Sequence, residues 1–190
     1  ANSFTQFAQA IQARYLLGLT ATPERSDDRS IFTHFDMRPD GSPAAQLRLW
    51  HALDQQLLAP FEYYACADNT DYRSVPWRQA GETSALDAVL TGNHVRAQAI
   101  VNAWQGLVSN IEECRALAFC VTIAHAKFMA EMFNQAGIKA ACITGEASAS
   151  EREALPRMLE RRDINVLVTV DLYNEGVDLP FVDTLLLLRP

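Results

Sequence analysis

The sequence lacks a glycine-rich turn of the kind that cradles nucleotide phosphates. Its 190 residues include only eight glycines. The closest pair, Gly137 and Gly145, is too far apart for either a GxGxxG or a GxxxxGK[ST] turn. The four histidines are scattered without an HExxH pattern, and no GxSxG nucleophile elbow occurs. These absences exclude a self-contained dinucleotide or triphosphate site, and they argue against metal ligation and against hydrolase chemistry within these residues.

Little in the sequence suits an oxidising compartment or a membrane. The four cysteines have no CxxC spacing, and three of them lie in apolar runs that predict strands, which favours buried, reduced thiols. No run approaches the roughly 18 consecutive apolar residues that a membrane helix needs. The first residues also lack the basic segment followed by an apolar segment that marks a signal peptide. We therefore expect a cytoplasmic protein without a membrane partner.

The chain also lacks an excess of positive charge. Its formal net charge is −7 and its pI is about 5.0, so any contact with nucleic acid must be local rather than driven by a global field. With 49% apolar residues, the chain has enough material for one complete α/β domain and a remnant of another. Because it starts without methionine and stops just after an apolar run, we expect both ends to be cuts through a longer protein.

A regular alternation of elements begins at Asn93, which is a suitable N-cap. Gly137 fits the position after a helix, and Ser150 with Glu153 predicts a capping box, although Pro156 should kink or delay that helix. Apolar runs that alternate with amphipathic stretches predict a parallel sheet with helices on both faces, an α/β fold. The predicted strands are 116–121, 138–143, 164–170 and 182–188, and the predicted helices are 93–111, 124–136 and 151–161.

The first half of the chain is less regular. Turn-forming and charged residues over 24–43 indicate a domain boundary, and the polar segment 67–92 is typical of a solvated loop. Spacing also predicts a helix over 4–13, a buried strand at Tyr15–Leu19, a helix around 47–57 and a strand at 61–66.

Polar residues follow three of the predicted parallel strands. Thr122 follows the first, Thr144 and Gly145 follow the second, and Thr169 lies near the end of the third. Ligands bind beyond the carboxyl ends of parallel strands, where hydroxyls and backbone N–H groups suit phosphate oxygens. Threonine also favours strand ends and helix caps, so a purely structural role is the alternative for each of them.

Three segments, in this order and spacing, resemble motifs of the superfamily 2 helicases, the DEAD/DEAH-like motors that include the translocating subunits of restriction enzymes. Residues 18–25 (Gly-Leu-Thr-Ala-Thr-Pro-Glu-Arg) resemble motif III. Residues 115–122, together with 124–126, are similar to motif IV and the helix after it, and residues 168–180 look like motif V.

The resemblance implies a RecA-like architecture in three parts. Residues 1–30 would be the C-terminal remnant of the first motor domain, and residues 31–60 a linker with a connecting helix. Residues 61–190 would be the second motor domain, truncated before motif VI.

The resemblance also implies site residues. Thr20, Ala21 and Thr22 would link the state of ATP to domain closure, and Gly176 with Asp178 would face the nucleotide across the cleft between the domains. The contacts to the phosphates of the nucleic-acid strand would come from Thr122, Thr144, Gly145 and Thr169.

What lies outside the sequence matters equally in this comparison. The phosphate-loop lysine, the Asp-Glu box that holds Mg²⁺ and the arginine finger of motif VI are missing. The resemblance therefore implies a parent helicase or translocase that uses ATP and Mg²⁺ on nucleic acid, with DNA favoured over RNA. The fragment alone would hold no catalytic residue and bind no cofactor.

Two further expectations follow. A non-enzymatic module with a RecA-like fold, binding nucleic acid or protein, is the alternative function, because one fold carries many functions. The strand at Tyr15–Leu19 would lack its sheet in the isolated fragment, so we expect it either to pack against the second domain or to pair with another copy of the chain in a dimer.

Overall fold

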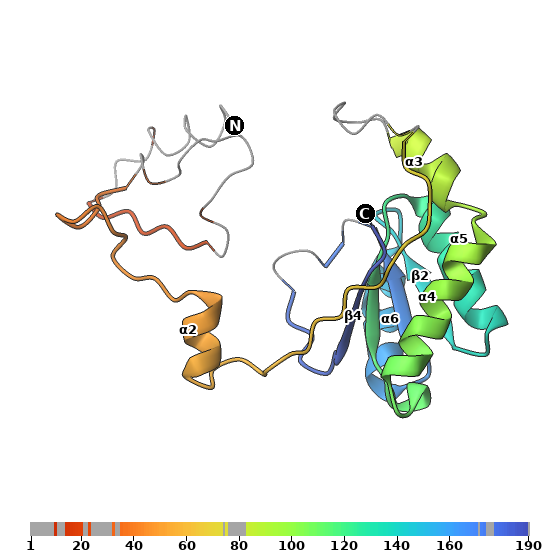
Figure 1. Ribbon diagram of the computed structural model, residues 1–190. Helices are drawn as coiled ribbons and strands as arrows, with labels where there is room; N and C mark the ends of the chain where they lie inside the picture. The colour runs from red at the N-terminus through yellow and green to blue at the C-terminus, as the bar shows by residue number, and fades with distance from the viewer. Residues whose placement is uncertain are drawn as a thin grey trace. The chain divides into compact units, whose positions relative to one another are not determined.

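The computed structural model describes residues 10, 14–20, 23, 32, 35–73, 75, 83–170, 172–173 and 177–189 (Figure 1). The chain divides into two compact units, Ala1–Tyr64 and Ala65–Pro190.

The second unit is built on a four-stranded parallel sheet. The strands are β1 (Ala116–Phe119), β2 (Ala140–Ile143), β3 (Val166–Thr169) and β4 (Thr184–Leu187), in the order β2-β3-β1-β4. The two central strands, β1 and β3, are buried along their whole length, as their continuous apolar sequences predict.

Helices cover both faces of this sheet (Figure 1). Side chains of α4 (His94–Leu107) and α5 (Ile123–Gln135) form one core with Ala118 and Val168. On the other face, Leu159 of α6 (Ala149–Arg161) packs with Leu117 and Leu167. Because successive side chains of a strand point to opposite faces, each central strand serves both cores. The predicted parallel sheet with helices on both faces is confirmed.

The helix ends confirm two predicted caps and correct a third. The side chain of Asn93 accepts from the backbone N–H of Arg96, and Gly137 follows α5 with φ +80°. The capping box of α6, however, is formed by Ser148 and Glu151, two residues before the predicted pair. Pro156 lies inside α6 and does not delay its start.

A helix that the sequence did not predict precedes α4. The polar segment 67–92 was expected to be a loop, but it contains α3 (Thr83–Leu90). Leu90 is only 1% exposed, so one apolar side chain at the end of the helix anchors it to the core. The last predicted turn of α4 is also absent, since α4 ends at Leu107 and a short 3-10 helix, η2 (Ile111–Glu113), follows.

The first unit contains less regular structure than predicted. Where this unit is described over more than single residues, it contains one helix, α2 (Leu49–Asp54). The predicted strands at Tyr15–Leu19 and 61–66 are wrong, because both segments are irregular. A strand needs a neighbour for its backbone hydrogen bonds, and the apolar pattern alone does not supply one. The predicted helix over 4–13 lies outside the described residues, apart from Ala10.

Candidate nucleic-acid interface at the strand carboxyl ends

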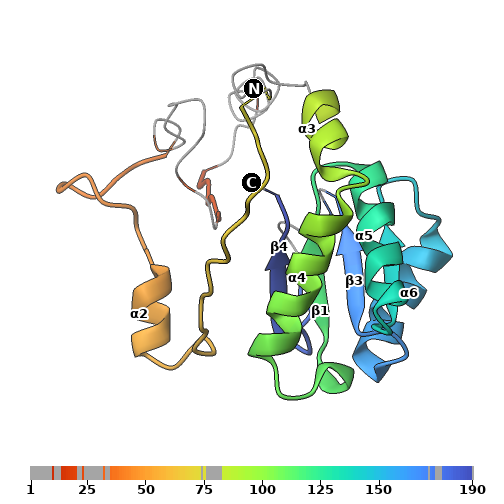
Figure 2. The same ribbon diagram turned by 45° about the vertical axis from the view of Figure 1, so that its right-hand side comes forward.

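Parallel pairing brings the carboxyl ends of the four strands to one edge of the sheet, which we call the rim. The arrows of β3 and β4 point to this end, where α3 also lies (Figure 2). The rim comprises the residues at or just after each strand end: 120–122, 144–146, 169–170 and 188–189. Thr122, Thr144, Gly145 and Thr169 therefore share one edge, as the sequence predicted.

Thr122 is the N-cap of α5. Its hydroxyl oxygen accepts from the backbone N–H of His125 at 3.0 Å, and its hydroxyl donates to the carboxylate of Asp87. The hydroxyl thus has the structural role that threonine favours at a helix start. A role toward a ligand would come in addition to this one.

Thr144 and Gly145 lie in a turn braced by α6. The Thr144 hydroxyl accepts from the N–H of Glu146 at 3.3 Å. The guanidinium of Arg152 donates to the carbonyls of Gly145 at 2.6 Å and Ala147 at 3.0 Å. Gly145 is exposed, so the turn presents backbone to the solvent at the rim.

Thr169 lies deeper than its proposed role suggests. It is 0% exposed, and its hydroxyl donates to the carbonyl of Leu172 at 3.5 Å. In this conformation it presents no surface to a ligand, so its phosphate contact stays a prediction.

The remaining predicted site residues lie elsewhere or outside the described part. Asp178 is exposed in the segment between β3 and β4, and Thr20 is exposed in the first unit. Ala21, Thr22 and Gly176 lie outside the described residues.

Arg96 of α4 contacts the rim at Leu188, and the sequence did not single it out. Its side chain is 10% exposed, and it donates to the carboxylate of Asp68 at 2.7 Å and to the carbonyl of Leu188 at 2.9 Å. Burial alone would raise the pKa of Asp68, but hydrogen bonds from Thr70, Tyr72 and Arg96 hold that pKa well below its usual range. The ion pair ties segment 68–72 to the exit of β4, a link between residues far apart in sequence that no local pattern indicates.

His125 is buried close to Arg96 and Asp87. It is 0% exposed, its Nδ1 accepts from the N–H of Val121 at 3.4 Å, and its Nε2 has no hydrogen-bond partner among the described residues. Burial, and then the positive charge of Arg96, lower the pKa of His125 to about 4. The imidazole is therefore neutral at neutral pH and belongs to the core.

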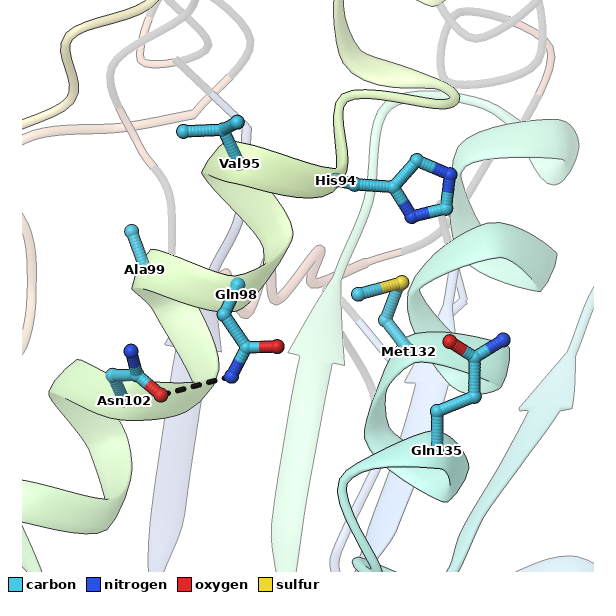
Figure 3. A pocket seen from close by; sticks show the side chains of 7 residues that line it. All are labelled: His94, Val95, Gln98, Ala99, Asn102, Met132 and Gln135. Atoms are coloured by element: carbon cyan, nitrogen blue, oxygen red, sulfur yellow. Dashed lines mark hydrogen bonds between the residues drawn. The ribbon is translucent and has the colours of Figure 1, made fainter.

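An open groove of about 620 Å³ lies between α4 and α5 (Figure 3), and none of the predicted ligand residues lines it. Gln98 donates to Asn102 at 2.9 Å along its α4 side. No carboxylate, lysine or arginine lines the groove. Its lining residues are His94, Val95, Gln98, Ala99, Asn102, Met132 and Gln135.

The residues that the structure describes form no complete site for ATP or Mg²⁺. Across the ranges that the structure describes, no three His, Cys, Asp or Glu side chains come together as a metal site. The glycines are too dispersed for a phosphate loop.

Among the residues that the structure describes, no helix is long and apolar enough to span a bilayer.

Comparison with known proteins agrees with the motifs. Residues 99–190 match the family described as "Helicase conserved C-terminal domain". Residues 99–190 thus form a helicase C-terminal domain, which agrees with the resemblance of the motifs to the superfamily 2 helicases. The matched range begins within α4 and includes the whole sheet and rim, so the candidate interface lies in the helicase C-terminal domain.

The relatives of this chain include one named as a DNA helicase and one named as an RNA helicase. It is 30% identical over 177 residues to a putative DNA 3'-5' helicase Rad25 of Haloarcula marismortui, covering 90% of this chain and 25% of the relative. It is 31% identical over 104 residues to a probable ATP-dependent RNA helicase of Methanocaldococcus jannaschii, covering 52% of this chain and 28% of the relative. A Lactococcus phage protein of 51.5 kDa is 26% identical over 183 residues, covering 92% and 36%. The chain therefore spans 36% or less of the length of each of these relatives.

Proposed function

We propose that this chain supplies the second motor domain of an ATP-dependent helicase or translocase. The rim residues Thr122, Thr144, Gly145 and Thr169 hold the phosphates of one nucleic-acid strand. The single observation that carries this proposal is the parallel topology, which gathers three threonine-bearing strand ends on one edge of a helicase C-terminal domain.

The parts of the chain outside the rim take the roles that the motifs imply. Gly176 and Asp178 complete one wall of the ATP cleft, and residues 20–22 couple the state of ATP to domain closure. Residues 1–30 then belong to the first motor domain, 31–60 to a linker with a connecting helix, and 61–190 to the second motor domain. The groups that hold Mg²⁺ and the triphosphate come from elsewhere in the parent protein.

We propose DNA as the strand and the cytoplasm as the setting. The match to the putative DNA helicase extends over 177 residues of this chain, against 104 for the probable RNA helicase. The four cysteines are free, which suits a reducing compartment.

Binding of a short single-stranded oligonucleotide, followed by fluorescence anisotropy, tests the proposal. Few phosphate contacts and a net charge of −7 predict weak binding that falls further as salt rises. Thr144→Val should weaken it, because it removes a hydroxyl at the rim. Tight, sequence-selective binding at physiological salt would instead support the non-enzymatic binding module.

Phosphate release from ATP is the second measurement. The chain alone should release none above a heat-inactivated control, with or without oligonucleotide, because hydrolysis needs ligands that it does not contain. Stimulated release by the purified chain would contradict the assignment of the catalytic groups to the rest of the parent protein.

A further inference from the structure

The hydroxyl of Thr122 is already fully engaged as a donor. A threonine hydroxyl has one hydrogen to donate and two lone pairs that accept. The hydrogen is donated to Oδ1 of Asp87 in α3, and one lone pair accepts from the N–H of His125 at 3.0 Å. The same Oδ1 also accepts from the hydroxyl of Thr91 at 2.7 Å. Asp87 therefore gathers two hydroxyls at the start of α5.

A strand phosphate would need the same hydrogen. Phosphate oxygens, like carboxylate oxygens, only accept hydrogen bonds, so Thr122 cannot donate to both groups at once. The two groups also share a charge, and both are favoured near the positive end of a helix, here the first turn of α5. A phosphate at Thr122 thus meets a carboxylate that occupies its hydrogen-bond donor and repels it.

We propose that Asp87 is an internal competitor of the nucleic-acid strand at the rim. In the strand-free state its carboxylate takes the place of a phosphate on Thr122, and strand binding at this position requires Asp87 to leave. This inference rests on the proposed function, because it describes the regulation of the same phosphate site. It assigns to α3 the role of a gate whose release accompanies strand binding.

The attachment of α3 suits such a role. α3 lies at the rim end of the sheet (Figure 2), and the side chain of its last residue, Leu90, is fully buried. Asp87 itself is half-buried. Its carboxylate can therefore leave Thr122 when the turns of α3 up to Asp87 unwind, while Leu90 remains packed.

A double-mutant cycle on strand affinity tests the competition. The variants are Asp87→Ala, Thr122→Val and the pair together, with Asp163→Ala as the matched control. Asp163 is an exposed aspartate just after α6, at the opposite end of the sheet, so its loss changes the net charge equally. Binding of short homopolymeric DNA and RNA oligonucleotides is measured at fixed, low salt, and thermal melting confirms that each variant folds.

Asp87→Ala should raise the affinity of the wild-type chain roughly three- to tenfold, the worth of about one hydrogen bond. In the Thr122→Val background, where there is no hydroxyl to release, the same change should raise affinity less than about twofold. Asp163→Ala should leave affinity unchanged. An equal gain in both backgrounds would mean that only charge matters, and an unchanged affinity of Asp87→Ala would mean no competition; either result overturns the inference and leaves the proposed function standing. If no variant binds any oligonucleotide, both the inference and the proposed function fail.

Hydrogen exchange of the wild-type chain gives a second readout that needs no variant. The N–H of Thr91 donates to the carbonyl of Asp87 at 2.8 Å, so it reports on the last turn of α3. Saturating oligonucleotide should speed exchange of the α3 amides while the amides of β1 and β3 stay protected. Slower exchange of α3 on strand binding would show that the strand holds α3 in place and would overturn the competition.

Discussion

His125 gives the chain an acid-sensitive core. Its pKa is about 6.5 when unfolded and is lowered to about 4 in the fold, so between these values the unfolded chain binds a proton that the folded chain excludes. Stability is therefore lost as the pH falls from 6.5 toward 4, by at most about 3 kcal/mol. Urea unfolding at neutral pH and near pH 5 should show this loss. His125→Gln should remove most of it, whereas His51→Gln, a change at an exposed histidine of α2, should not.

The Asp68–Arg96 pair should contribute more than an exposed ion pair. Arg96 is 10% exposed, so its loss leaves the Asp68 carboxylate and the Leu188 carbonyl without their donor, and Arg96→Ala should cost about 2 kcal/mol. Arg73→Ala is the matched control, since Arg73 pairs with Asp71 on the exposed surface at 2.6 Å and its loss should change the free energy of unfolding far less. Both values come from urea unfolding at neutral pH. Equal losses in the two variants would show that the Asp68–Arg96 pair contributes no more to stability than the exposed Asp71–Arg73 pair.

The start of α6 shows that Ser148, and not the predicted Ser150, is the N-cap of this helix. Ser148 accepts from the N–H of Glu151 at 3.3 Å, and the Glu151 carboxylate accepts from the Ser148 N–H at 2.8 Å. Ser148→Ala should therefore cost about 1 kcal/mol of unfolding free energy, and Ser150→Ala less than about 0.5 kcal/mol. A larger loss at Ser150 would restore the predicted cap and contradict the observed start of the helix.

The elements that the sequence predicted well are those whose signal is local. Each strand of the second unit lies within its predicted range. The two central strands, β1 and β3, are buried on both faces, and such strands are continuous apolar runs in the sequence. The apolar run at Tyr15–Leu19 also predicted a strand, but no described strand pairs with it and the segment is irregular. α3 was missed because its segment is polar and a single leucine anchors it.

The candidate site divides in the same way. Parallel topology, predictable from the alternation of strands and helices, brings the threonines to one rim. Asp87 and Arg96 were not predicted, because their partners Thr122 and Asp68 lie 35 and 28 residues away in sequence. Such pairs depend on how α3, α4 and the sheet pack, which no local pattern encodes.

The two units of the chain differ in what holds them together. Both hydrophobic cores consist of residues between Ala97 and Leu188, all of them in the second unit. In the first unit, apolar side chains are exposed over Tyr15–Leu19, with Tyr15 at 81% and Leu19 at 88%. The second unit should thus carry the folding stability, and the first unit should carry a tendency to associate.

Deletion of residues 1–64 tests this division. The shortened chain, 65–190, should keep the urea midpoint of the whole chain within error, because no residue of the two described cores is removed. The whole chain should associate as its concentration rises, seen by sedimentation, and the shortened chain should stay monomeric over the same range. Leu17→Lys with Leu19→Lys in the whole chain should abolish the association without moving the midpoint, whereas Arg14→Lys, a change beside the same segment that keeps its charge, should alter neither. A lower midpoint for 65–190 would mean that the first unit stabilises the second, and association that survives both lysines would place the contact outside Tyr15–Leu19.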